Sequence, residues 1–287
     1  MTPSDYEYLR KLLKERSGLD LSADKQYLVE SRLVPLARRV GLTDIPELVR
    51  KIKGGGADAL TTEVVEAMTT NETFFFRDKI PFDHMRETVL PALTQARANR
   101  RALRIWSAAC STGQEPYSIA MLLKEADKVL AGWRMEIVAT DLSQSVLEKS
   151  KAGLFSQFEV QRGLPIQMLI KHFMQVGELW QLNADIRAMV QHRQLNLLQD
   201  FSQLGTFDVI FCRNVLIYFD QDTKTNVFSR LAKVVEPDGF LMLGAAETVV
   251  GLTEAFKPYP DRRGLYMPNG ARGARAGQPA LKAVASR

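Results

Sequence analysis

The sequence predicts an α/β protein in which a doubly wound, mostly parallel sheet follows a small all-helical domain. From Leu103 onward, short apolar or β-branched runs alternate with helical stretches, which is the pattern of strand–helix–strand units. Residues 1–68 instead carry apolar side chains at helical spacing. Residues 166–198 break the alternation with a helix followed by short strands of polar alternation, which indicates an insertion between strands of the main sheet.

The N-terminal part, residues 1–68, is expected to form a separate helical domain. Apolar spacing predicts helices over residues 6–16, 26–40 and 59–68, and a further helix that begins at Asp44-Ile-Pro-Glu. Gly41 and the run of three glycines at 54–56 are typical of helix ends.

Residues 69–100 are expected to form a linker that leads into a helix over residues 81–95, and residues 101–267 to form the sheet domain. The alternating runs predict strands at 103–109, 135–141, 207–214 and 239–247, separated by helices at 116–126, 143–153 and 221–235. Parallel strands place their carboxyl ends along one edge, where such sheets bind ligands. The tail, residues 268–287, is rich in Gly, Ala and Arg, and we expect it to be disordered.

The composition indicates a cytoplasmic protein. Apolar residues make up 46% and charged residues 25%, as is usual for globular proteins in water. No apolar run approaches the roughly 20 residues that a membrane helix needs, and the N-terminal segment lacks the apolar core of a signal peptide. The formal charge of +5 favours an acidic partner, whether nucleic acid, anionic membrane or acidic protein surface.

Cysteine and histidine usage indicates that the protein holds no metal. The two cysteines do not form a CxxC pair, and the three histidines do not have the spacing of metal ligands; these residues are Cys110, Cys212, His84, His172 and His192.

The turn after the first expected strand, residues 108–117, is the first candidate binding element. Its small residues and Gly113 permit a ligand to approach the backbone closely. The spacing matches neither GxGxxG nor a Walker loop, so a diphosphate is not the predicted ligand. Glu115 would repel a phosphate but suits a cationic ligand, although it also fits a simple helix-capping role.

Asp141, at the end of the second expected strand, is the second candidate. An acidic residue in this place of a nucleotide-binding fold accepts hydrogen bonds from ribose hydroxyls. Asp141 could equally cap the next helix, because Leu-Ser follows it. Its combination with the Glu115 turn favours the ribose role.

Two further segments carry polar residues next to aromatic ones. Arg213 and Asn214 follow the third expected strand, with Tyr218 close behind. The Asn/Asp-Pro-Pro-Tyr/Phe motif of amine methylation is absent there, which argues against a nucleobase amine as substrate. Residues 68–78, MTTNETFFFRD, fit neither a helix face nor a strand, so they form either a buried interdomain linker or part of a site.

Together these motifs resemble the CheR chemoreceptor methyltransferases. The resemblance rests on MTTNETFFFRD at 68–78, SAACSTGQEPYSIA at 107–120, ATDLS at 139–143 and FCRNVLIYF at 211–219, and it extends to about residue 267. It implies a class I, Rossmann-like methyltransferase sheet with an inserted antiparallel β-subdomain. The substrate implied is the glutamate side chain of chemoreceptors, and the methyl donor is S-adenosylmethionine.

The resemblance also implies the site residues. Arg77 and Tyr218 correspond to groups beside the reacting centre. The cofactor contacts would be Asn71, Thr73, Arg77, Glu115, Asp141, Asn196, Leu197, Arg213 and Asn214. One departure is Gln114, where many relatives carry a second glutamate.

The chemistry of ester formation agrees with these residue types. A glutamate carboxylate is ionised at neutral pH, so the reaction needs no general base, and the motifs contain no histidine. Arg77 can orient the carboxylate, best through a single contact that leaves the nucleophile free. A nucleic-acid methyltransferase and a non-catalytic S-adenosylmethionine sensor remain as alternative functions.

Two hypotheses concern the partner. The second expected helix carries Arg32, Arg38 and Arg39, with Lys25 near its start, and could dock on the acidic methylation helices of receptors. Some members of the family also bind a C-terminal receptor pentapeptide as an added strand on the β-subdomain. The corresponding stretch here, residues 174–182, is short and has one glycine, so we expect no dependence on such a peptide.

Overall fold

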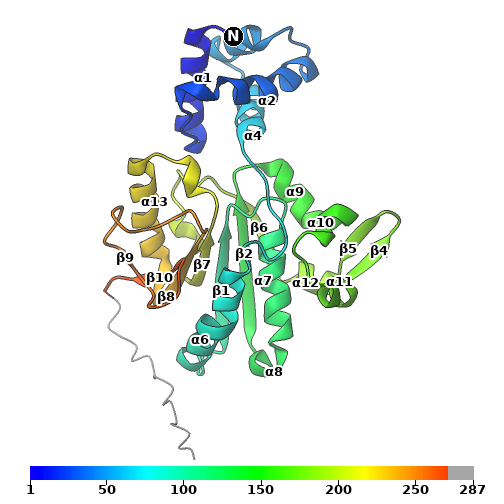
Figure 1. Cartoon of the computed structure of the whole chain (residues 1–287), viewed down its shortest axis with the longest axis vertical. Helices are drawn as coiled ribbons and strands as arrows, with labels where there is room; N and C mark the ends of the chain where they lie inside the picture. The colour runs from blue at the N-terminus through cyan, green and yellow to red at the C-terminus, as the bar shows by residue number, and fades with distance from the viewer. Residues whose placement is uncertain (271–287) are drawn as a thin grey trace, which may run out of the picture.

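The computed structural model describes residues 1–270, which form a helical domain set above a larger α/β domain (Figure 1). The helical domain contains α1 (Pro3–Ser17), α2 (Gln26–Arg39), α3 (Ile45–Lys53) and α4 (Asp58–Met68), as the sequence predicts. Their apolar faces meet in one core that includes Leu9, Leu13, Leu33 and Val64. No helix within residues 1–270 combines the length and apolar character needed to cross a membrane.

Local capping signals fix the first helix. Thr2 and Asp5 form a reciprocal capping box, and Pro3 occupies the first helical position. The helix ends at Gly18, whose φ of 78° is a left-handed conformation that glycine adopts without strain. This end is important because it reaches the functional site of the other domain.

The main sheet has seven strands in the order β6-β2-β1-β7-β8-β10-β9. The strands β1, β2, β6, β7 and β8 run parallel, and β10 and β9 close one edge with antiparallel pairing. Their bounds are β1 (Ala102–Ala108), β2 (Arg134–Asp141), β6 (Val190–Gln194), β7 (Phe207–Cys212), β8 (Val235–Leu243), β9 (Phe256–Pro258) and β10 (Leu265–Pro268). Strand order reverses between β1 and β7, which is the place where doubly wound sheets bind ligands.

Helices cover both faces of this sheet (Figure 1). Successive side chains of β1 show the two-sided burial: Ile105 packs in one apolar cluster and Trp106 in the other. The helices are α5 (Ile80–His84), a π-helical turn (Met85–Val89), α6 (Leu90–Ala96), α7 (Gln114–Glu125), α8 (Asp127–Leu130), α9 (Gln144–Ala152) and α13 (Gln221–Val234). The predicted doubly wound α/β architecture is therefore confirmed.

A small antiparallel sheet projects from one side of the α/β domain (Figure 1). It consists of β3 (Leu154–Ser156), β4 (Phe173–Val176) and β5 (Leu179–Leu182) in the order β3-β5-β4. The short helices α10 (Gln157–Gln161), α11 (Ile166–His172) and α12 (Ala184–Arg187) accompany it.

The boundaries of this insertion differ from the expected 166–198. The small sheet begins at Leu154, directly after the glycine that ends α9. The strand β6 pairs with β2 over five residues and so belongs to the main sheet. Its polar alternation reflects its place at an exposed sheet edge, where only one face is covered.

The C-terminal strands were also not expected. Pro268 pairs with Phe256, so ordered structure continues into residues 268–287, the predicted disordered tail. The remainder of that predicted tail, residues 271–287, lies outside the described residues.

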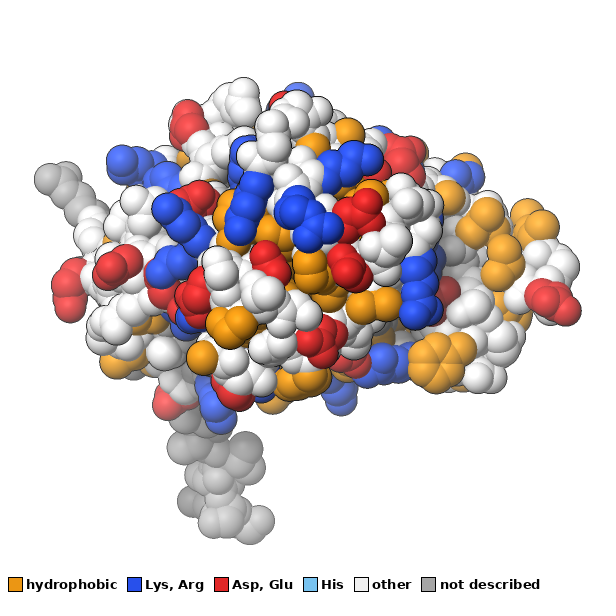
Figure 2. Space-filling view, turned by 90° about the horizontal axis from the view of Figure 1, so that it is seen from above, with side chains coloured by type: hydrophobic (Ala, Val, Ile, Leu, Met, Phe, Trp, Pro, Cys, Tyr) orange, Lys and Arg blue, Asp and Glu red, His pale blue; other side chains and the backbone are white. Residues whose placement is uncertain are grey.

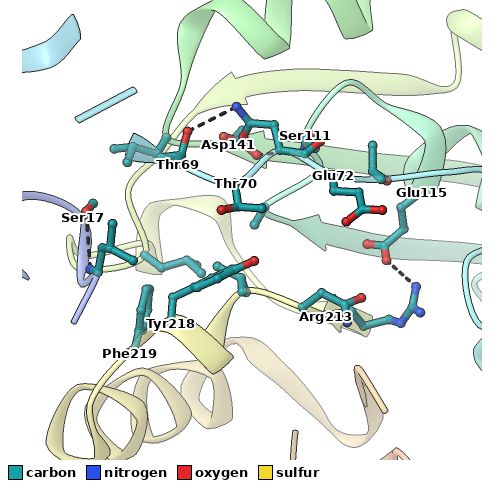
Figure 3. Close-up of a pocket in the computed structure, with 18 of the residues that line it drawn as sticks. Ser17, Thr69, Thr70, Glu72, Ser111, Glu115, Asp141, Arg213, Tyr218 and Phe219 are labelled. Carbon is teal, nitrogen blue, oxygen red and sulfur yellow. Dashed lines mark hydrogen bonds and ion pairs between the residues drawn. The ribbon is translucent and has the colours of Figure 1, made fainter. Parts of the chain in front are cut away.

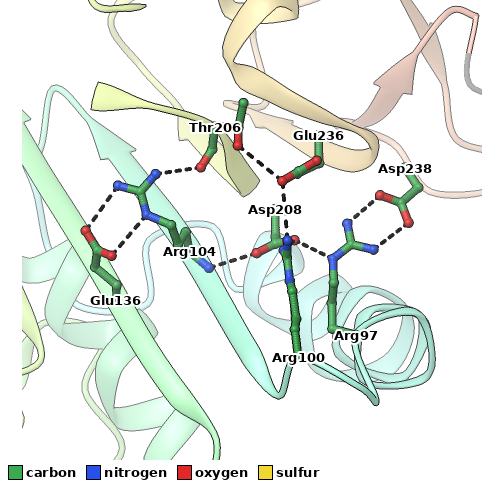
Figure 4. A network of polar contacts seen from close by, with 8 residues as sticks. All are labelled: Arg97, Arg100, Arg104, Glu136, Thr206, Asp208, Glu236 and Asp238. Atoms are coloured by element: carbon green, nitrogen blue, oxygen red, sulfur yellow. Dashed lines mark hydrogen bonds and ion pairs between the residues drawn. The ribbon is translucent and has the colours of Figure 1, made fainter. Parts of the chain in front are cut away.

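A buried ionic network fixes the end of the sheet where β1, β7 and β8 begin (Figure 4). The Asp208 carboxylate accepts from Arg97 Nε at 2.8 Å, from the Arg104 amide at 2.8 Å and from Arg100 at 2.5 Å. Arg97 also donates to Asp238 at the start of β8. Because each charged group is paired, this network ties α6 to three strands without leaving a buried charge uncompensated.

Candidate functional site

A pocket opens at the carboxyl ends of β1, β2, β6 and β7 (Figure 3). The end of α1 and the segment 69–77 cover it. All ten residues proposed from the sequence line this pocket: Asn71, Thr73, Arg77, Glu115, Asp141, Asn196, Leu197, Arg213, Asn214 and Tyr218. The fold thus brings together side chains that are up to 147 positions apart in the sequence, from Asn71 to Tyr218.

The turn between β1 and α7 forms one wall of the pocket. Ala109, Ser111 and Gly113 have φ angles of 61°, 52° and 97°, all in the left-handed region. A Cβ at Gly113 would lie 2.2 Å from Ser150 Oγ, so only glycine fits there. Positive φ at the two non-glycine residues indicates strain that the surrounding structure maintains, as is usual at functional sites.

Asp141 lies at the end of β2 and is 7% exposed. Its carboxylate accepts from the amide of Ser111 at 2.8 Å and from the amide of Ser143 at 3.0 Å. Burial raises the pKa of Asp141, while these backbone hydrogen bonds act in the opposite direction. A carboxylate has about four acceptor positions, so the group can still accept hydrogen bonds from a ligand's hydroxyls.

Glu115 and Arg213 form an ion pair beside this wall, with Arg213 Nη1 2.8 Å from Glu115 Oε2. Ser107 Oγ donates to the other Glu115 oxygen at 2.8 Å. Arg213 Nη2 donates to the Arg77 carbonyl and to Asp78, both at 2.8 Å. The Arg213 side chain is only 1% exposed and lies between two carboxylates. This cluster carries a net negative charge, which agrees with the predicted cationic ligand.

The segment 69–78 is anchored by its aromatic residues and also lines the pocket. Phe75 is fully buried, and its ring packs 5.0 Å from Phe155 and 5.7 Å from Phe173 of the small sheet. A Cβ at Gly163 would lie 2.1 Å from the Phe75 carbonyl oxygen, so a glycine is needed for this close approach. The aromatic residues therefore anchor the segment, and its polar residues line the pocket.

Arg77 and Tyr218 lie at the pocket with their functional groups largely uncommitted. Arg77 Nη1 donates to the Glu72 carbonyl at 2.7 Å. Its guanidinium also lies 5.6 Å from the centre of the Phe74 ring, within the range of a cation–π contact. Within residues 1–270 the Tyr218 hydroxyl makes no hydrogen bond. Both groups can therefore contact a substrate.

The N-terminal domain contributes to the pocket, which the sequence did not predict. Ser17 and Leu19 line it, and Asn196 Nδ2 donates to the Arg16 carbonyl at 2.6 Å. The amide of Asp20 donates to the Tyr218 carbonyl at 2.9 Å. These contacts join residues that are 180 and 198 positions apart, so no local pattern could have predicted them.

The same surface between the domains contains an ion pair. Lys14 lies 2.5 Å from Asp220, and this contact lowers the pKa of Asp220 to about 2. A Cβ at Gly18 would lie 2.8 Å from the Phe219 ring. The end of α1 thus rests directly on the chain that carries Tyr218.

Apolar side chains complete the pocket next to Asp141. Leu142 follows β2, and Leu195 and Leu197 follow β6. The resemblance implies Leu197 as a cofactor contact, whereas Leu142 and Leu195 are not predicted from the sequence. The rule that ligand-binding residues follow strand ends could have found Leu142 after β2, and it would also have found Leu195 had β6 been assigned to the main sheet. Among residues 1–270, no cluster of His, Cys, Asp and Glu is arranged to hold a metal.

Comparison with known proteins assigns both domains. Residues 4–69 match the family model of the CheR methyltransferase all-alpha domain, and residues 71–265 match that of the CheR methyltransferase SAM binding domain. The chain belongs to the CheR methyltransferase family. The family relationship is thus consistent with the resemblance inferred from the motifs.

Curated relatives support the same assignment over most of the chain. Chemotaxis protein methyltransferase 1 of Pseudomonas aeruginosa is 43% identical, with 88% of this chain and 93% of that protein covered. The chemotaxis protein methyltransferase of Vibrio anguillarum is 41% identical, with coverage of 90% and 94%. That of Borreliella burgdorferi is 34% identical, with coverage of 88% and 90%. The protein is therefore an S-adenosylmethionine-dependent methyltransferase with a class I fold.

The residues of the pocket fit S-adenosylmethionine. The buried Asp141 carboxylate suits ribose hydroxyls, the three leucines suit a flat adenine ring, and the acidic cluster around Arg213 suits a ligand with cationic groups. Gln114, the departure from the usual glutamate, is buried, and its Oε1 accepts from Thr112 Oγ1 at 2.8 Å. It is not among the residues that line the pocket, so the substitution leaves this set intact.

The role of Asp141 can be tested by binding. Asp141→Ala should weaken binding of the demethylated product, S-adenosylhomocysteine, at least about tenfold, because a charge-assisted hydrogen bond contributes about 1.5–3 kcal/mol. Titration calorimetry measures this affinity, and thermal unfolding checks that the variant is folded. Asp127→Ala, an exposed residue on α8, serves as the control. An unchanged affinity in Asp141→Ala would contradict the assignment to ribose.

Proposed function

We propose that the enzyme methylates glutamate side-chain carboxylates of chemoreceptors in the cytoplasm, giving methyl esters during chemotactic adaptation. The observation that supports this most is that all ten family-type residues line one pocket in a member of the CheR family. The two alternative functions, a nucleic-acid methyltransferase and a non-catalytic sensor, have no comparable support.

The site is suited to a nucleophile that is already charged. A glutamate with a pKa near 4.3 is ionised at neutral pH and needs no base. Bound S-adenosylmethionine supplies the electrophilic methyl group. The protein's task is then to align the carboxylate and exclude water, and such positioning can supply up to about 7–11 kcal/mol.

Arg77 and Tyr218 are the residues proposed to perform the alignment. Arg77 holds one hydrogen bond to the Glu72 carbonyl, so the rest of its planar fork can orient the substrate carboxylate. The Tyr218 hydroxyl can donate a hydrogen bond to the same carboxylate or fix the side chain next to it. Ser17 and Leu19 of the N-terminal domain cover the pocket and limit access of water.

Substitutions at the two residues should separate catalysis from cofactor binding. Arg77→Ala should lower methyl transfer by about 100-fold or more, since misplacement of a reacting group by about 1 Å has an effect of that size. Tyr218→Phe should lower kcat up to about tenfold, the effect of one lost hydrogen bond, and leave the affinity for S-adenosylhomocysteine nearly unchanged.

The assay uses S-adenosylmethionine with a labelled methyl group and receptor-containing membranes. Mild base releases label from glutamate esters as methanol, whereas methylated bases keep it, so the assay also tests the substrate class. Tyr259→Phe, a residue that is not in the pocket lining, is the matched control. If Tyr218→Phe abolishes cofactor binding without a separate effect on kcat, the proposed role is wrong.

Arg32 does not belong to the proposed receptor-docking surface, because its side chain is used within the protein. Its guanidinium donates to the carbonyls of Met68 and Thr69 at 2.5 and 3.0 Å and to Thr70 Oγ1 at 2.9 Å. Arg32 therefore holds the start of the segment that carries Asn71, and it is not a free docking charge. Arg38 and Arg39 are exposed, and basic side chains gather over the N-terminal domain with acidic ones among them (Figure 2).

The exposed arginines and Arg32 should therefore behave differently. The double substitution of Arg38 and Arg39 by Ala should slow receptor methylation at low salt and weaken its salt dependence, with unchanged affinity for S-adenosylhomocysteine. Arg32→Ala should weaken that affinity, because the segment 68–70 loses its donors. The double substitution of Lys233 and Lys257, both exposed outside this domain, removes the same charge as a control. Parental rates for the Arg38 and Arg39 variant at low salt would defeat the docking hypothesis.

We also propose that the enzyme does not depend on binding a C-terminal receptor pentapeptide. Only Gly177 and Glu178 connect β4 to β5, so the turn is short. Trp180 lies in the central strand, and its Nε1 donates to Gln157 at 2.7 Å, so it packs within the subdomain. Several apolar side chains around this sheet are nevertheless exposed, namely Phe158, Ile166, Ile170, Met174, Val176 and Leu179.

Titration calorimetry tests whether the enzyme binds the receptor pentapeptide. Titration of the purified protein with free C-terminal receptor pentapeptides should give no heat of binding, because the two-residue turn offers little backbone to hold a peptide's terminal carboxylate. Binding with a Kd in the micromolar range would show that the open edge of β4 accepts the peptide and that the length of the turn does not predict peptide binding.

A further inference from the structure

Glu247 forms a cluster of backbone hydrogen bonds just behind the pocket. One carboxylate oxygen accepts from the amides of Val215 at 3.0 Å and Leu216 at 2.8 Å. The other accepts from the amides of Asn214 at 2.8 Å and Gly244 at 2.7 Å. A single side chain thus receives four backbone N–H groups, three of them from consecutive residues.

The backbone on both sides of the Glu247 carboxylate has the conformation that these hydrogen bonds require. Asn214 has a φ of 58°, a conformation that turns the following amides toward Glu247. At Gly244 a Cβ would lie 2.8 Å from Glu247 Oε2 and 2.8 Å from Asn214 Nδ2. The end of β8 therefore approaches the loop after β7 so closely that a side chain at 244 would displace one or the other.

The loop that Glu247 holds is the one that carries the site. Asn214, Val215 and Tyr218 all line the pocket, whereas Glu247 does not. The short 3₁₀ helix Leu216–Tyr218, labelled η4, begins at the last amide that Glu247 accepts and ends at Tyr218. Glu247 therefore sets where that helix starts.

We propose that Glu247 is a positioning residue that fixes the loop 214–218 and, through it, the place of the Tyr218 hydroxyl in the methyl-transfer site. This inference rests on the role of Tyr218 proposed above. A carboxylate is required because both of its oxygens accept from two donors each. A glutamine would present an NH₂ group to two of the four N–H groups and would displace them.

Glu247→Gln tests the proposal in the methyl-release assay. We expect kcat to fall by up to about tenfold, no more than in Tyr218→Phe, with a smaller change in the affinity for S-adenosylhomocysteine. Glu236→Gln is the matched control, because Glu236 lies near the start of the same strand and accepts from Arg100 and Thr206 at the far end of the sheet. That variant should retain the parental kcat. A parental kcat in Glu247→Gln would overturn the proposal.

A double substitution separates positioning from general loss of stability. If Glu247 acts through Tyr218, the combined Glu247→Gln and Tyr218→Phe variant should be no slower than the slower single variant. Multiplicative losses would overturn the proposal. If Tyr218→Phe alone has parental activity, the role of Tyr218 fails; if it is impaired while Glu247→Gln is not, only the positioning role fails.

Gly244→Ala provides a second test if Glu247→Gln is too unstable to assay. It keeps every charge and inserts a methyl group between Glu247 and Asn214. We expect the same pattern, with kcat reduced more than cofactor affinity. Thermal unfolding of each variant defines the temperature at which the assays are run, and a parental kcat in folded Gly244→Ala would contradict the proposal.

Discussion

The site depends on the buried guanidinium of Arg213, which joins three separate segments of the chain. It bonds to Glu115 at the start of α7, to Asp78 and to the Arg77 carbonyl, while Arg213 itself follows β7. Removal of one partner from such a buried pair costs about 3–5 kcal/mol, because the other charge is left uncompensated. Arg213 therefore fixes the segment that presents Arg77 to the sheet, and its two partners Glu115 and Asp78 leave the cluster net negative, which suits a cationic cofactor.

The two ends of the sheet have different physical characters. At one end, Asp208 and Arg97 belong to a fully paired network that joins β1, β7 and β8 (Figure 4). At the other end, Ala109, Ser111 and Asn214 adopt left-handed conformations that cost of order 1–3 kcal/mol each. The paired network at the start of the strands supports the strained turns at their carboxyl ends. Strands that are fixed at their first residues also hold their last residues in place.

Features governed by local rules were predictable from the sequence, and features that depend on distant contacts were not. Strand–helix alternation predicted the sheet, and the position after a strand end predicted Asp141 and Arg213. The strand β6 was assigned to the insertion because an exposed edge strand has the polar alternation of a small surface sheet. The roles of Arg32 and Glu247 arise from partners 36 and 33 positions away, and in sequence both look like ordinary surface charges.

The N-terminal domain is part of the pocket, because Ser17 and Leu19 line it. Leu19 lines the pocket, Asp20 bonds to the Tyr218 carbonyl, and Arg32 holds the start of the cofactor segment. A carboxylate attacks a methyl group faster once water is excluded from it, so the cover acts on the chemistry itself. The proposed docking residues Arg38 and Arg39 follow Arg32 on α2 by six and seven positions. A receptor that bound at these proposed residues would therefore contact the helix whose Arg32 holds the start of the segment that lines the pocket.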